Sequence, residues 1–128
     1  MRVLLDTHAL LWFSLDDTRL SIRAKSAMMD RNNDMLVSPA TLWEVAIKVS
    51  LGKYELEEEF TSFFSRVLAG YNITLLPVAI EHAAAVTRLP SHHRDPFDRM
   101  LVAQAISEDI PIVSADRSLD AYSVTRIW

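Results

Sequence analysis

The chain has 128 residues, half of them apolar and 23% charged, so it can bury the core of one domain. It has no cysteine, which excludes a disulfide framework, cysteine-based catalysis and a zinc finger. Its 13 lysines and arginines against 17 acidic residues give a formal net charge of −4, the opposite of the balance usual in nucleic-acid-binding proteins.

Nothing in the sequence marks a boundary between domains. The chain has only two glycines, scattered prolines and no internal repeat or linker-like run. The apolar run from Ala9 to Phe13 is too short for a signal sequence or a membrane span. We therefore expect a single domain over residues 1–128 that is cytoplasmic and makes no contact with a membrane.

Short apolar runs alternate with longer helical stretches along the whole chain. The predicted strands are Arg2–Leu5, Met35–Val37, Ile73–Val78, Ile112–Val113 and Val124–Trp128. The predicted helices are His8–Ser14, Ser21–Asp30, Ala40–Leu51, Glu58–Leu68, Ala79–Arg88 and Phe97–Glu108. This alternation predicts an α/β fold, a three-layer α/β/α sandwich with a short, mostly parallel sheet.

Two of these helices have clear start signals. Ser38-Pro39 and Asp95-Pro96 each place a capping residue before a proline, which is favourable at the first helical position. Both helices that follow are apolar nearly all round near their starts, so we expect each to be buried on more than one side.

Four acidic residues follow or begin these elements. Asp6 closes the first strand, Asp116 follows the strand Ile112–Val113, and Glu44 and Asp98 lie in the first turns of the two capped helices. Ligands of open parallel sheets bind at the carboxyl ends of the strands, so one edge of the sheet can gather all four acids. The strand order that would do so is not visible in the sequence.

Clustered carboxylates repel one another and need compensation. Mg²⁺ and Mn²⁺ prefer oxygen ligands, which suits a site built from aspartates and one glutamate. We therefore expect Mg²⁺ (or Mn²⁺) as the cofactor.

Each acid also has a purely structural interpretation. Asp6 can cap the following helix, and Glu44 can complete a capping box with Thr41 or pair with Lys48. Asp98 is favoured by the helix dipole, and Asp116 lies in a sequence typical of turns. No single acid decides between structure and function.

Other residues and chemistries fit less well. Asp95 is assigned to helix capping because it precedes Pro96, and His92-His93-Arg94 is predicted to be an exposed loop. The four histidines lack the spacing of a zinc site. Glycine stands only at positions 52 and 70, which excludes a P-loop, a dinucleotide-binding motif and a serine-hydrolase elbow.

Five segments together resemble a known family. They are Val3–Trp12 (VLLDTHALLW), Ser38–Lys48 (SPATLWEVAIK), Leu51–Lys53 (LGK), Arg94–Ala105 (RDPFDRMLVAQA) and Val113–Asp116 (VSAD). The set resembles the PIN-domain family, and more narrowly the VapC-type toxins of bacterial toxin–antitoxin pairs. The resemblance extends over almost the whole chain.

The resemblance implies a PIN-like sandwich and an endoribonuclease that depends on magnesium or manganese. It implies RNA as substrate, a cognate antitoxin protein that blocks the site, and a homodimer. It assigns the catalytic and metal-binding acids to Asp6, Glu44, Asp98 and Asp116, of which Asp116 varies most within the family. Thr7 and Ser114 resemble hydroxyl positions that hold such a site.

The leading hypothesis is therefore hydrolysis of RNA phosphodiester bonds by a metal-activated water. A phosphatase or receiver-type α/β domain is an alternative, although phosphatases of that kind usually carry a second aspartate where this chain has His8. The second alternative is a non-catalytic acidic interaction module.

Basic and aromatic residues near these segments have open roles. Arg99 and Arg117 stand beside two of the acids and can meet substrate phosphates or pair with carboxylates. Lys48 and Lys53 can extend a basic rim. Phe60, Phe63 and Phe64 are predicted to be the aromatic side chains most exposed to solvent, because they follow a run of glutamates.

Overall fold

The computed structural model describes all residues from Met1 to Trp128. Its strands are β1 (Arg2–Leu5), β2 (Asp34–Val37), β3 (Thr74–Leu75), β4 (Ile112–Val113) and β5 (Arg126–Ile127). Its helices are α1 (Thr7–Ser14), α2 (Ile22–Met29), α3 (Pro39–Ser50), α4 (Phe60–Gly70), α5 (Ile80–Val86), α6 (Pro96–Glu108) and a short 3₁₀ helix, η1 (Arg117–Ala121).

The five strands form one sheet in the order β3-β2-β1-β4-β5. Every neighbouring pair is parallel, with Leu5 of β1 opposite Val37 of β2 on one side and Val113 of β4 on the other. β1 is therefore the central strand, and the segments that follow β1, β2 and β4 leave the sheet at the same edge.

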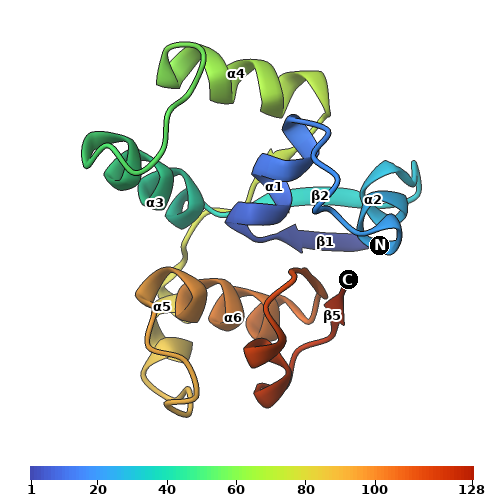
Figure 1. Ribbon diagram of the computed structural model, residues 1–128. Helices are drawn as coiled ribbons and strands as arrows, with labels where there is room; N and C mark the ends of the chain where they lie inside the picture. Colours follow the sequence, from blue (N-terminus) through green and yellow to red (C-terminus); the bar gives the residue numbers. More distant parts are fainter.

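Helices cover both faces of the sheet, as Figure 1 shows for α3 and α4 on one side and α5 and α6 on the other. The alternation of side chains along β1 divides the core accordingly. Val3 and Leu5 pack in a cluster with residues of α1, α2 and α4, while Leu4 packs in a second cluster with Leu101 and Val102 of α6. The predicted three-layer α/β/α sandwich is confirmed.

The two predicted helix starts are also confirmed. The Ser38 hydroxyl accepts a hydrogen bond from the Ala40 backbone N–H, at 3.1 Å, at the start of α3. Oδ1 of Asp95 accepts hydrogen bonds from the N–H groups of Phe97 and Asp98, at 2.8 and 3.1 Å, at the start of α6. In both helices proline occupies the first turn, where its missing N–H leaves no donor unpaired.

Two expectations about length and burial are wrong. β3 has two residues rather than the six of Ile73–Val78, because Pro77 has no N–H with which to continue the ladder. Phe63 and Phe64 are buried, since they face the core on the inner side of α4. In α3 the residues Thr41, Glu44 and Val45 are buried, while the side chain of Trp43 is 65% exposed.

None of the helices combines the length and the apolarity that crossing a membrane would require.

Candidate metal centre

The four sequence-predicted acids come together at the edge of the sheet where β1, β2 and β4 end. Asp6 directly follows β1, Asp116 follows β4, Glu44 lies in α3 after β2, and Asp98 is the third residue of α6. All four line one cavity of about 300 Å³, called here the acidic pocket. The rest of its wall is formed by Thr7, His8, Lys48, Asp95 and Ala115.

Asp6 and Glu44 form the buried side of the acidic pocket, with only 7% and 5% of their surface exposed. Oδ1 of Asp6 accepts a hydrogen bond from the Ala9 N–H at 2.8 Å, so this residue also caps α1. Burial raises the pKa of Asp6, although hydrogen bonds from the Ser114 side chain and from Ala9 act in the opposite direction.

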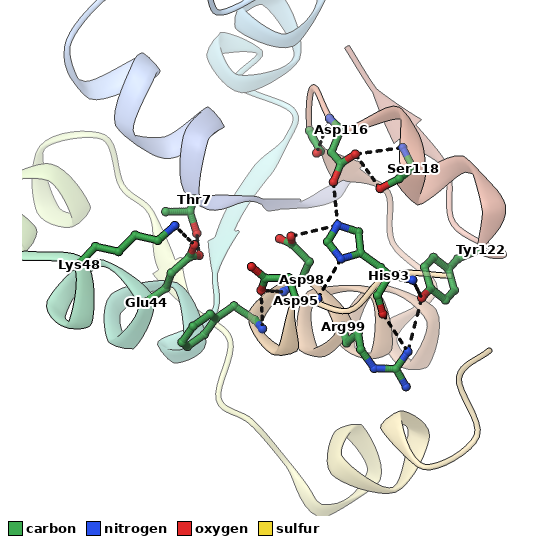
Figure 2. Close-up of polar contacts among 12 residues, drawn as sticks. Thr7, Glu44, Lys48, His93, Asp95, Asp98, Arg99, Asp116, Ser118 and Tyr122 are labelled. Atoms are coloured by element: carbon green, nitrogen blue, oxygen red, sulfur yellow. Dashed lines mark hydrogen bonds and ion pairs between the residues drawn. The ribbon is translucent and has the colours of Figure 1, made fainter. Parts of the chain in front are cut away.

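Both oxygens of Glu44 are held by donors from the chain. The Thr7 hydroxyl donates to Oε1 at 2.6 Å, and Lys48 Nζ donates to Oε2 at 2.7 Å (Figure 2). The hydrogen bond with Glu44 also raises the pKa of Lys48 above its usual value. The structural interpretation of Glu44 as a helix ion pair is thus correct, and the same carboxylate still faces the acidic pocket.

Asp98 and Asp116 form the outer side of the acidic pocket. Burial raises the pKa of Asp98 to about 7, and the negative charges of Asp95, Glu44 and Asp6 add to this effect. Partial burial acts to raise the pKa of Asp116 as well, but hydrogen bonds from Ser118 and His93 outweigh it and leave that pKa below its usual value. The two neighbouring aspartates therefore differ in how readily they ionise.

His93 is the site residue that the sequence did not reveal. The loop containing it was predicted to be exposed, but its side chain is 18% exposed and lies between two of the acids. Its Nε2 is 2.9 Å from Asp116 Oδ2 and 3.3 Å from Asp98 Oδ2 (Figure 2). The exposed-loop prediction is therefore wrong for His93. The available signal was its place two residues before the α6 cap, which directs it toward the start of that helix.

One polar atom from each of His93, Asp98 and Asp116 lies within 4.8 Å of the other two, close enough to share a cation. The donors around the acidic pocket are mainly carboxylate oxygens, and the chain has no cysteine. That donor set fits a hard divalent ion such as Mg²⁺ or Mn²⁺.

The residues that flank the acids in sequence, Thr7, Ser114 and Asp95, form hydrogen bonds that support the site. Thr7 and Ser114 are buried, and the Ser114 hydroxyl accepts a hydrogen bond from the Asp116 backbone N–H at 3.0 Å. Asp95 caps α6 as expected, and it also lines the acidic pocket.

The two arginines beside the acids behave differently. Arg99 forms no pair with a carboxylate, because its guanidinium donates to backbone carbonyl groups, among them Pro90 at 3.0 Å. It therefore fixes the loop that carries His93. Arg117 is exposed at the start of η1, directly after Asp116.

Comparisons with known proteins agree with this architecture. The family model described as "PIN domain" matches residues 3–124, and the chain belongs to this family. Its sequence is 27% identical over 130 residues to Ribonuclease VapC22 of Mycobacterium tuberculosis, covering 98% of each protein.

Solved structures share the fold at low sequence identity. VapBC2 from Rickettsia felis, crystallised with a DNA fragment of its promoter, matches with a TM-score of 0.73 and 13% identity, over 98% of this chain and 97% of that one. FitAcB from Neisseria gonorrhoeae matches with a TM-score of 0.66 and 20% identity, over 97% and 95%. VapBC-5 from Mycobacterium tuberculosis, described as a member of a family of toxin–antitoxin systems, matches with a TM-score of 0.62 and 18% identity, over 98% and 97%.

Proposed function

We propose that this protein is an endoribonuclease that hydrolyses RNA phosphodiester bonds with the help of Mg²⁺ or Mn²⁺. The observation that carries the proposal is the convergence of Asp6, Glu44, Asp98 and Asp116, from four separate segments, on one pocket of about 300 Å³. Such crowding of negative charge is unfavourable unless a cation compensates it.

The four acids would be the groups that hold the cation. When bound, a divalent ion supplies two things: it lowers the pKa of a water that becomes the nucleophile, and it stabilises negative charge on the phosphate. The ion would also offset the repulsion between the acidic pocket and a phosphate backbone. This resolves the conflict between the net charge of −4 and a nucleic-acid substrate.

The chain's own residues orient these acids before any ligand arrives. Thr7 and Lys48 fix the two oxygens of Glu44, and the Ala9 N–H fixes Oδ1 of Asp6. Arg117, exposed beside Asp116, is placed to meet a substrate phosphate. The protein's contribution is mainly positioning, which is typical of metal-assisted phosphodiester hydrolysis.

The relatives support a biological role as well. The similarity to a ribonuclease named VapC22 supports RNA as substrate, and structural likeness to a member of a toxin–antitoxin family supports a role as a toxin, which we propose acts in the cytoplasm. We propose that a cognate antitoxin protein covers the acidic pocket and that the toxin forms a homodimer.

The two alternatives account for fewer of the observations. A phosphatase of the kind considered above requires a second aspartate at position 8, where the chain has histidine. An acidic module that binds basic partners would present its acids on an open surface, whereas Asp6 and Glu44 are buried.

The test is cleavage of a mixed RNA pool with Mg²⁺ or Mn²⁺, with and without a chelator, for the parent and for Asp6→Asn. Asparagine still caps α1 but supplies no charge to a cation, so the variant is expected to fold and to lose about 100-fold or more of the activity. Asp34→Asn is the matched control, because Asp34 is exposed at the opposite end of the strands. Cleavage at the parent rate by Asp6→Asn would exclude the proposal.

A further inference from the structure

His93 is a half-buried titratable side chain beside the acidic pocket that the proposed function leaves without a role. It belongs to the loop before α6, and its ring points between two aspartates that come from different segments (Figure 2). Its geometry allows two roles. The ring could bind the cation directly as a fifth ligand, or it could hold the aspartates that bind it.

Two side chains hold the backbone of the loop that carries His93. Its N–H donates to the Tyr122 hydroxyl at 2.9 Å, and that hydroxyl donates to the Pro90 carbonyl at 3.0 Å. Arg99 donates to the same carbonyl at 3.0 Å. The loop is therefore tied to Tyr122, directly after η1, and to Arg99 of α6, which keeps its backbone beside the aspartates.

One hydrogen bond also determines where the ring carries its proton. The Asp95 backbone N–H donates to Nδ1 of His93 at 3.1 Å. A backbone N–H can only donate, so Nδ1 must be the acceptor and carries no hydrogen. The neutral ring then has its proton on Nε2, the atom that faces the aspartates.

An N–H at this position meets two acceptors. Nε2 is hydrogen-bonded to Oδ2 of Asp116 at 2.9 Å and lies 3.3 Å from Oδ2 of Asp98, so the ring stands between the two carboxylates. Without that donor the two acids would repel each other. For Nε2 to bind a cation instead, the proton would have to move to Nδ1, and the hydrogen bond from Asp95 would be lost.

We propose that His93 is a positioning residue: its Nε2–H holds Asp98 and Asp116 at the spacing that the cation requires, and the ring is not a ligand of that cation. The proposal rests on the proposed function, since it assumes that these acids bind a divalent ion. It concerns binding geometry, so it is tested without RNA.

The first test measures Mn²⁺ binding by calorimetry for the parent and three variants. His93→Gln places an amide N–H near the position of Nε2, whereas His93→Asn replaces only the Nδ1 side of the ring and His93→Ala removes both. We expect the Asn and Ala variants to bind Mn²⁺ about tenfold more weakly or worse, and the Gln variant to stay within about threefold of the parent. Thermal unfolding in metal-free buffer identifies any variant that does not fold.

The second test uses the parent protein alone and is independent of folding defects. With the histidines labelled with ¹⁵N, NMR of the metal-free protein is expected to show the Nε2–H tautomer for His93. Pulsed electron paramagnetic resonance of the Mn²⁺ complex is expected to show no nitrogen coupling from a coordinated imidazole.

A coordinated imidazole, an Nδ1–H tautomer, or a His93→Gln variant as weak as His93→Ala would overturn the positioning role and leave the proposed function intact. A parent protein that binds no Mn²⁺ at all would overturn the proposed function itself, and the positioning role with it.

Discussion

The carboxylates of the acidic pocket are held by neighbours of different kinds. Glu44 has a donor on each oxygen, Thr7 on one side and Lys48 on the other. Asp98 has only the long contact with His93, and it lies among other acids. A variant that removes one neighbour should therefore affect cation binding in a way that depends on which acid loses its support.

Thr7→Val tests the support of Glu44. Valine matches threonine in shape but removes the hydroxyl that donates to Oε1, so Glu44 loses its orientation while the core stays filled. We expect about tenfold weaker Mn²⁺ binding by calorimetry. Thr125→Val is the control, because Thr125 is exposed and does not line the acidic pocket. Equal binding by the two variants would refute the role of Thr7.

Asp98→Asn tests the electrostatic cost of the pocket in metal-free protein. The pKa of Asp98 is raised to about 7, above the value of an unfolded chain, so its contribution to stability is lost as pH rises from about 4 to 7. In chelator at pH 8, Asp98→Asn should be more stable than the parent by on the order of 2 kcal/mol, and near pH 4 the difference should vanish. Urea unfolding at both pH values measures this; a variant that is less stable at pH 8 would contradict it.

The ends of individual helices could be predicted where residues next to them in the sequence determine them. The starts of α3 and α6 follow from a capping residue and a proline, and the structure has both where the sequence indicates them. The burial of Phe63 and Phe64 was mispredicted because the preceding glutamates suggested an exposed segment. Their burial depends instead on which side of α4 packs against the core. The loop containing His93 was mispredicted because contacts with Tyr122 and Arg99 turn it inward. Tyr122 is distant in sequence, and no pattern in the sequence indicates the contact with Arg99.

Asp95→Ala tests how far the cap of α6 supports the element that carries Asp98. The side chain accepts two backbone N–H bonds, so alanine is expected to lower the free energy of unfolding by about 1–2 kcal/mol. Asp95→Asn keeps an acceptor oxygen and should recover most of that loss. Chemical denaturation measures both, and an alanine variant as stable as the parent would show that the cap does not support α6.

At the scale of the whole molecule, the strand order is what makes a site out of scattered acids. β1 lies between β2 and β4, so the segments that begin with Asp6, Ser38 and Ser114 leave the same edge of the sheet. The sequence predicted the α/β/α class and the four acids, but strand order depends on long-range pairing and was not visible. The resemblance to the PIN-domain family, rather than the hydrophobic periodicity, assigned the four acids to one catalytic site.

The most direct test of the central claim is anomalous diffraction, at the manganese absorption edge, from crystals of the parent protein soaked in Mn²⁺. The account predicts a strong peak in the acidic pocket, with carboxylate oxygens of Asp6, Glu44, Asp98 and Asp116 directed at it and Nε2 of His93 outside its coordination shell. A peak only at other carboxylates, or no peak at a concentration that supports cleavage, would contradict it.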